Sequence, residues 1–122
     1  MEALILVGLA LAISVAGGLG AVLRLVLARW NGYLPWGILL SNSLASALAG
    51  FLVLAVVDRS VNAILVSGLL GGLSTFSSWA AANGEYQAAG LRLKSLLNWS
   101  ANLVIPMLAA GFGLAVGGLL IN

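Results

Sequence analysis

Four long apolar runs, separated by short polar breaks, constrain the fold of this 122-residue chain more than any other feature. The runs cover residues 3–29, 36–57, 61–84 and 95–121. Each run is long enough for a helix to cross the hydrocarbon core of a lipid bilayer, which takes about 20 residues. Hydrophobic residues make up 62% of the chain and charged residues 7%, against about 45–50% and about 25% in a soluble domain. The sequence therefore predicts an all-α, multi-pass integral membrane protein with a single domain of four transmembrane helices, residues 1–122.

The scarcity of reactive side chains excludes most enzymatic and metal chemistry. The sequence has no cysteine and no histidine, so it offers no thiol nucleophile, imidazole base or ordinary transition-metal site. Its three acids, Glu2, Asp58 and Glu85, fall at expected helix ends, whereas a proton-coupled carrier needs a carboxylate inside the membrane. An enzyme is therefore not expected, and a coupled small-ion transporter is the least favoured function. The five basic residues form no stripe with interleaved aromatics, so no nucleic-acid partner is expected.

The basic residues are biased toward two of the three loops. Arg29 lies at the first loop and Arg92 and Lys94 at the third, while Arg59 alone marks the second. Because cytoplasmic loops carry an excess of Lys and Arg, the first and third loops are expected in the cytoplasm and both termini outside.

The segment GLLGGLSTFSSW, residues 68–79, is unsuited to an unbroken membrane helix. Its three glycines weaken a helix near the middle of the third run, and the four hydroxyl side chains that follow can bond to freed carbonyls or to an ion. Irregular backbone at membrane depth is tolerated only where protein buries it or water reaches it, and transporters place ion sites at such breaks. We therefore expect a third helix broken near its middle that carries an ion site; a kink rich in Ser and Thr is the alternative.

Aromatic and amide side chains near this segment favour a small anion as the ion. Phe76 and Trp79 are three residues apart and share a helix face, and their ring edges carry positive charge density. Such edges attract an anion weakly enough to release it, and the indole adds an N–H donor. Asn42 either lines the pathway as an amide donor or serves as an interhelical hydrogen bond. Arg24 either has a functional role or extends to the lipid headgroups.

Three blocks of the sequence resemble the signature blocks of a known family. GGLGAVLR (17–24), WGILLSNSLASALAGF (36–51) and above all GLLGGLSTFSSW (68–79) are similar to those of the Fluc, or CrcB, family of bacterial fluoride channels. Length, number of spans and block order agree as well. The resemblance implies an antiparallel dimer with two pores and a structural sodium ion at its interface, in the bacterial plasma (inner) membrane. It implies passive export of cytoplasmic fluoride, and hence fluoride resistance.

The resemblance also implies roles for individual residues. The residues implied for the pore are Asn42, Thr75, Phe76, Ser78 and Trp79; the backbone carbonyls implied for sodium are those of Gly71 and Ser74; and Arg24 has an implied structural role. In the fourth span the match is loose, and Asn98, Ser100 or Asn102 could supply its polar positions.

Departures from the family pattern leave the composition of the dimer open. The pattern TTFSTF reads STFSSW here, so Trp79 stands where a second phenylalanine is expected; Ala45 replaces a usual glycine and Ile38 a usual threonine. Together with the charge bias, these departures allow either a homodimer or pairing with a homologous second subunit of fixed, opposite orientation. A non-conducting subunit, in which Trp79 blocks one pathway, is the alternative function.

Overall fold

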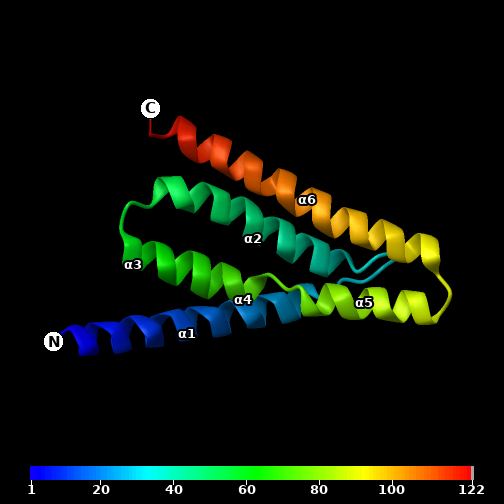
Figure 1. The fold of residues 1–122 in the computed structure, drawn as a ribbon, viewed down its shortest axis with the longest axis horizontal. Helices are drawn as coiled ribbons and strands as arrows, with labels where there is room; N and C mark the ends of the chain where they lie inside the picture. Colours follow the sequence, from blue (N-terminus) through cyan, green and yellow to red (C-terminus); the bar gives the residue numbers. More distant parts are fainter. Residues whose placement is uncertain (122) are drawn as a thin grey trace.

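The computed structural model describes residues 1–121 and is entirely helical and loop over that range. Four helical stretches are long and apolar enough to cross a membrane, namely α1 (Glu2–Leu27), α2 (Trp36–Ala55), the composite stretch Arg59–Ala88 and α6 (Arg92–Leu119). Successive stretches run in opposite directions, so the two chain ends lie at the same end of the bundle (Figure 1). The predicted class, an all-helical protein with four long apolar helices, is confirmed.

The third stretch is composed of four helical pieces. These are α3 (Arg59–Asn62), the π-helical η1 (Ala63–Leu70), α4 (Gly71–Leu73) and α5 (Ser77–Ala88). Between α4 and α5 the chain is not helical, and Ser74 has an extended ψ of 154°, where a helix has about −42°. This interruption, residues 74–76, directly follows the glycine pair at 71–72, and Figure 1 draws it as a short coil between the two helices.

The two most extensive helix contacts of the bundle both depend on glycine. α2 packs along α6, and α1 packs against η1 and α4. A Cβ atom added to Gly113 would overlap the carbonyl of Ala47 on α2, and one added to Gly72 would overlap the carbonyl of Gly17 on α1. Small residues let membrane helices approach to backbone contact, which replaces the hydrophobic driving force absent between helices in lipid.

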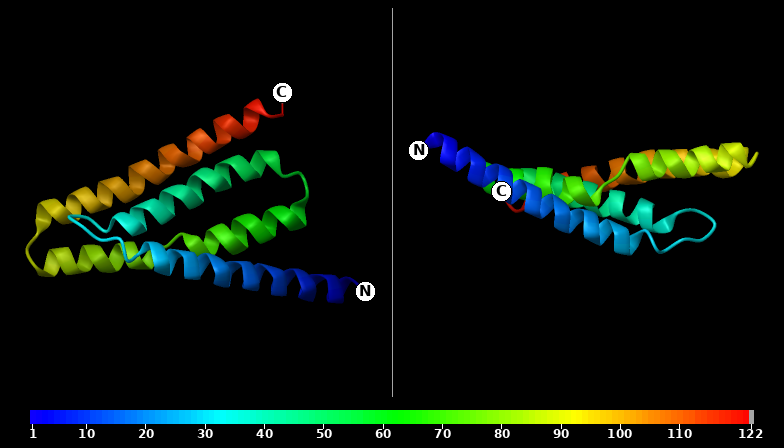
Figure 2. Two further views of the ribbon diagram at one scale, coloured as in Figure 1. Left: turned by 180° about the vertical axis from the view of Figure 1, so that it is seen from behind. Right: turned by 90° about the horizontal axis from the view of Figure 1, so that it is seen from below.

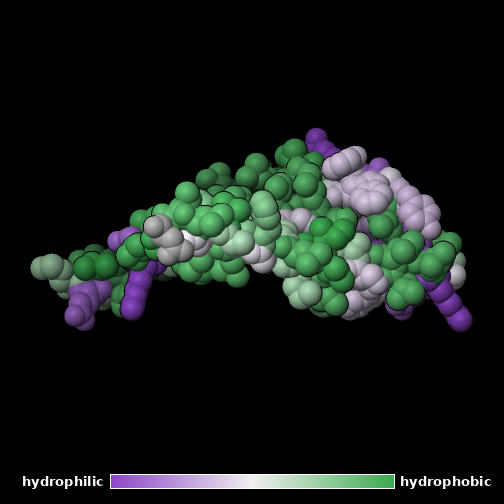
Figure 3. All heavy atoms as spheres, turned by 90° about the horizontal axis from the view of Figure 1, so that it is seen from above, coloured by the Kyte–Doolittle hydropathy of each residue, from purple (hydrophilic) through white to green (hydrophobic). Residues whose placement is uncertain are grey.

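Most large apolar side chains point outward. Leu4 on α1 is 77% exposed and Phe112 on α6 is 69% exposed, and the N-terminal part of α1 extends beyond the other helices (Figure 2). On the face drawn in Figure 3, hydrophobic surface dominates, and the strongly hydrophilic residues lie mainly toward the two ends. An apolar surface this large fits lipid or a second copy of the chain rather than water.

The interior is more polar than the surface. Seven buried residues are polar, namely Ser41, Asn42, Thr75, Asn83, Ser95, Asn98 and Asn102. They come from α2, from the interruption, from α5 and from α6. Because buried polar groups in a membrane protein mark bonding networks or solute pathways, this polar interior defines where the functional site lies.

Candidate ion-conduction site

Asn42 of α2 holds the interruption in place. Its Oδ1 accepts a hydrogen bond from the backbone amide of Thr75 at 2.7 Å, and its Nδ2 donates to the Thr75 carbonyl at 3.2 Å. In a continuous helix the Thr75 amide would bond to the carbonyl of Gly71, four residues earlier. The side-chain amide therefore substitutes for a helical hydrogen bond, which satisfies the irregular backbone inside the membrane.

Thr75 starts the second half of the third stretch. Its Oγ1 accepts from the backbone amide of Ser78 at 3.2 Å, the arrangement of an N-cap that begins α5. The same hydroxyl lies 3.1 Å from the Ser78 Oγ and 3.3 Å from the Ser77 Oγ. The Thr75 hydroxyl thus bonds both to the Ser78 hydroxyl and to the Ser78 backbone amide at the start of α5.

A central cavity of about 200 Å³ opens beside the interruption. The residues that line it are Asn42, Ser46, Ser74, Thr75, Phe76, Trp79, Asn102 and Pro106. Four of the five residues implied for the pore therefore meet here. Ser78 instead lines a different cavity, together with Ala28 and Glu85.

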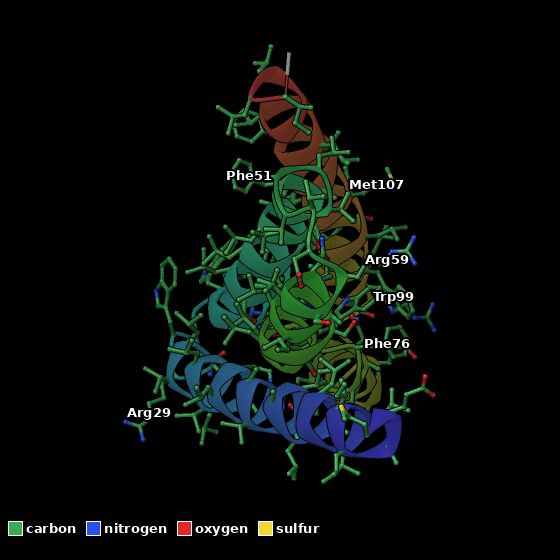
Figure 4. All side chains as sticks on the ribbon, turned by 90° about the vertical axis from the view of Figure 1, so that its left-hand side faces the viewer. Arg29, Phe51, Arg59, Phe76, Trp99 and Met107 are labelled. Atoms are coloured by element: carbon green, nitrogen blue, oxygen red, sulfur yellow. The ribbon has the colours of Figure 1, made fainter. Side chains whose placement is uncertain are left out.

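Three aromatic rings form a continuous row that begins at the central cavity, which Phe76 and Trp79 line. Phe76 meets Trp79 at 5.3 Å between centroids with the planes at 89°, and Trp79 meets Trp99 at 4.4 Å and 62°. Phe76 is 66% exposed whereas Trp79 is 7% exposed. In Figure 4, Phe76 and Trp99 project to the same side of the molecule, opposite to Arg29. Edge-to-face packing of this kind fixes ring orientation.

The indole N–H of Trp79 already has a partner. Nε1 donates to the backbone carbonyl of Asn98 at 3.2 Å, which joins α5 to α6. Trp79 thus lines the central cavity with its indole donor already engaged.

The amide side chains on α6 complete the polar side of the site. Asn102 Oδ1 accepts from Asn42 Nδ2 at 3.3 Å, and Asn102 Nδ2 donates to Asn98 Oδ1 at 2.9 Å. Asn98 is fully buried, while Ser100 is exposed. Of the three candidates in the fourth span, the structure brings Asn98 and Asn102 to the site and turns Ser100 away.

Sequence reasoning missed four residues that extend this network. Ser95 Oγ donates to Asn83 Oδ1 at 3.3 Å, Gln87 Nε2 lies 3.4 Å from Ser95 Oγ, and Asn83 Nδ2 donates to the Trp79 carbonyl at 3.2 Å; Trp99 is the fourth. A signal existed in the spacing, because Ser95, Asn98 and Asn102 recur at intervals of three and four and so share one helix face.

Arg24 and the carbonyls implied for sodium meet at the interruption. Arg24 Nη1 donates to the Ser74 carbonyl at 3.2 Å, so in this structure the guanidinium reaches the interruption from α1. The Gly71 carbonyl lacks its helical hydrogen bond, because the Thr75 amide donates to Asn42 instead. Gly71 is exposed and, together with Ser74, lines a neighbouring cavity of about 150 Å³. Carbonyl oxygens suit a hard cation, so the donors fit sodium, although Ser74 already accepts a cationic donor.

Comparison with known proteins gives the family. The family described as CrcB-like protein, Camphor Resistance (CrcB), matches residues 11–114. This chain belongs to the CrcB family. That matched range contains the Arg24 contact, the interruption, the aromatic row and both α6 amides.

Curated relatives of this CrcB chain carry channel names. A protein of Symbiobacterium thermophilum named fluoride-specific ion channel FluC 1 is 34% identical over 116 residues, covering 86% of this chain and 94% of that protein. A fluoride-specific ion channel FluC of Agrobacterium fabrum is 37% identical over 119 residues, covering 86% and 92%. A third, from Variovorax paradoxus, is 40% identical over 79 residues, covering 58% and 63%. The relatives are named as ion channels rather than enzymes, which confirms the non-enzymatic class predicted from the sequence.

Proposed function

We propose that this chain forms a passive, fluoride-selective channel that exports fluoride from the cytoplasm across the bacterial plasma (inner) membrane and so provides fluoride resistance. The observation that carries the proposal is the central cavity, where an amide, a hydroxyl group and aromatic rings converge at a helix interruption. The relatives named fluoride-specific ion channels support fluoride as the ion.

The chemistry of the central cavity suits an anion that must enter and leave quickly. Ring edges present positive charge density without a full charge, and the two N–H bonds of the Asn42 amide are held in long hydrogen bonds of 3.2 and 3.3 Å that an ion can replace, so these groups take over part of the ion's hydration without trapping it. Among the described residues that line the cavity none is a carboxylate. Because a coupled transporter needs a titratable group in the pathway, this composition supports passive conduction.

We further propose that the conducting unit is an antiparallel dimer with two pores. Phe76 belongs to the central cavity but is 66% exposed in a single chain, and a second copy would cover it. Two subunits would also bring together two sets of the Gly71 and Ser74 carbonyls, enough oxygen donors for a structural sodium ion at the interface. A single chain supplies only two of these donors.

A second candidate rests on Trp79. Its indole is bulkier than a phenyl ring, is 7% exposed and is held by the hydrogen bond to Asn98, so it narrows the pathway that it lines. A homodimer of conducting subunits is the main proposal. A non-conducting or fixed-orientation subunit that pairs with a homologous chain is the alternative, and the bias of basic residues toward the first and third loops supports a fixed orientation.

Fluoride efflux from liposomes that contain the purified chain alone tests the proposal. A fluoride electrode follows the release, chloride efflux serves as the selectivity control, and Phe76→Ile removes the exposed ring of the site. Rapid fluoride release without chloride release, lost in the variant, is the expected result. Folded protein that releases no fluoride would contradict a self-sufficient channel and support the two-subunit alternative.

A further inference from the structure

A second cavity lies next to the central one, at the end where α5 leads into α6. It measures about 480 Å³ and is lined by Gln87, Arg92, Ser95, Leu96 and Trp99. We call it the outer cavity. Figure 1 shows this end of the bundle opposite to the two chain termini. The outer cavity therefore lies at the end of the bundle that is remote from the chain termini.

The ring pair Trp79 and Trp99 separates the two cavities. Trp79 lines the central cavity and Trp99 lines the outer one, and their centroids lie 4.4 Å apart. Polar groups run alongside this pair, because Asn83 bonds both to the Trp79 carbonyl and to Ser95 of the outer cavity. The two cavities thus share one wall that polar side chains flank.

A buried donor beside this wall lacks a partner. Asn98 precedes Trp99 in the chain and accepts the Trp79 indole N–H. Its side chain is 0% exposed, yet its Nδ2 has no hydrogen-bond partner within residues 1–121. Leaving a buried donor without a hydrogen bond costs free energy, so we expect Nδ2 to bond to an acceptor such as a water molecule or an anion.

The two cations in the first turn of α6 have different surroundings. Lys94 Nζ lies 4.5 Å from the centroid of the Tyr86 ring and 5.2 Å from that of the Tyr33 ring, so its charge forms cation–π interactions with both rings. Arg92 is exposed and lines the outer cavity, and its guanidinium forms no ion pair or side-chain hydrogen bond with the residues that the structure describes. Its positive charge is therefore available to an anion in the outer cavity.

We propose that the outer cavity is an anion vestibule in which Arg92 raises the local concentration of small hydrated anions before they reach the central cavity. The inference rests on the proposed function and adds an electrostatic residue to it. The outer cavity is large enough to hold an ion together with its water, so it attracts chloride as well as fluoride. Arg92 consequently sets the rate of fluoride entry, and the central cavity sets the selectivity.

Replacing Arg92 with Gln tests the rate. A unit charge that acts over about 6 Å in unscreened water changes the local anion concentration about threefold, and screening at an ionic strength of about 0.1 M, with a Debye length of about 10 Å, reduces this to about twofold. We expect Arg92→Gln to release fluoride about twofold more slowly at about 0.1 M and at the parent rate at about 1 M, where the Debye length falls to about 3 Å. The variant, like the parent, should release no chloride, because the central cavity and not Arg92 sets the selectivity. Arg59→Gln, the same change in α3 at the opposite end of the bundle, serves as the matched control.

A labelling experiment tests the anion attraction without any flux. The chain has no cysteine, so Leu96→Cys places a single thiol in the outer cavity, where Leu96 is 62% exposed. At an ionic strength of about 0.01 M, where the Debye length is about 30 Å, adding Arg92→Gln should slow its reaction with anionic sulfonatoethyl methanethiosulfonate about threefold relative to neutral methyl methanethiosulfonate.

The two experiments separate the possible failures. Unchanged labelling ratios, or an equal slowing of efflux by Arg92→Gln and Arg59→Gln, would overturn the vestibule. A parent chain that releases no fluoride but shows the labelling effect would overturn the proposed function and leave the anion attraction of Arg92 standing.

Discussion

Replacing Asn42 with Ala should destabilise the fold at the interruption. The side chain forms three hydrogen bonds, two to Thr75 and one to Asn102. Interhelical hydrogen bonds in membranes contribute about 0.6 kcal/mol each on average and about 1.7 kcal/mol at most, so three bonds give about 2 kcal/mol with an upper limit of about 5 kcal/mol. A loss of about 2 kcal/mol corresponds to about a 30-fold increase in the unfolding equilibrium constant.

Unfolding in mixed micelles of increasing dodecyl sulfate content measures this loss, and hydrogen exchange adds local resolution. Without Asn42, the Thr75 amide has either no partner or the carbonyl of Gly71, and the second choice rebuilds a continuous helix. Exchange at residues 74–76 should accelerate in the first case. In the second case the amide stays protected, but the rotation of α5 relative to α4 displaces Phe76, and fluoride release is lost.

Ser46→Ala is the matched control for this variant. Ser46 lies one turn further along α2 and lines the same central cavity, and its hydroxyl forms no hydrogen bond among residues 1–121. It should therefore leave stability within about 0.5 kcal/mol of the parent. Equal stability, exchange and fluoride release in Asn42→Ala and Ser46→Ala would refute the role assigned to the amide.

Three further predictions follow from individual contacts. Gly113→Ala places a methyl group against an α2 carbonyl and should cost about 1–3 kcal/mol in micelle unfolding, whereas Gly111→Ala, which meets open space, should be neutral or stabilising by about 1 kcal/mol. Trp79→Phe removes the bond to the Asn98 carbonyl and should cost about 1 kcal/mol while retaining fluoride efflux; efflux that appears only in this variant would establish that the indole blocks the pathway. Lys94→Gln removes contacts with two tyrosine rings and should cost about 1–2 kcal/mol, and Lys94→Arg should restore most of it.

The apolar runs predicted the helices well because burial in lipid makes hydropathy and structure nearly equivalent. The run at 95–121 corresponds to α6, which begins earlier, at Arg92, because a helix continues into the headgroup region as long as its backbone bonds are satisfied. The π-helical form of η1 was not predictable, since its sequence AILVSGLL is as apolar as any α-helix in the membrane. η1 packs against α1, a contact that the apolar run does not specify.

The candidate site was predicted only in part because residue type does not reveal a bonding partner. The sequence placed Asn42, Phe76 and Trp79 near a helix interruption, and they line one cavity. It did not reveal that the Trp79 indole bonds to a backbone carbonyl on α6, a contact between segments 19 residues apart. It also did not reveal that Ser78 lines a different cavity while its hydroxyl bonds to that of Thr75, because the face of each hydroxyl depends on where the helix restarts.

The polar interior explains why an open site is stable in this chain. A helix interruption inside a membrane requires partners for its freed backbone groups, and here α2 supplies the amide of Asn42 and α1 supplies the guanidinium of Arg24. Both helices therefore contribute to the backbone geometry of the site. In the channel that we propose, the surfaces left for an ion are ring edges and amides in long hydrogen bonds. Binding of an anion to such surfaces is loose, which is the condition that rapid conduction requires.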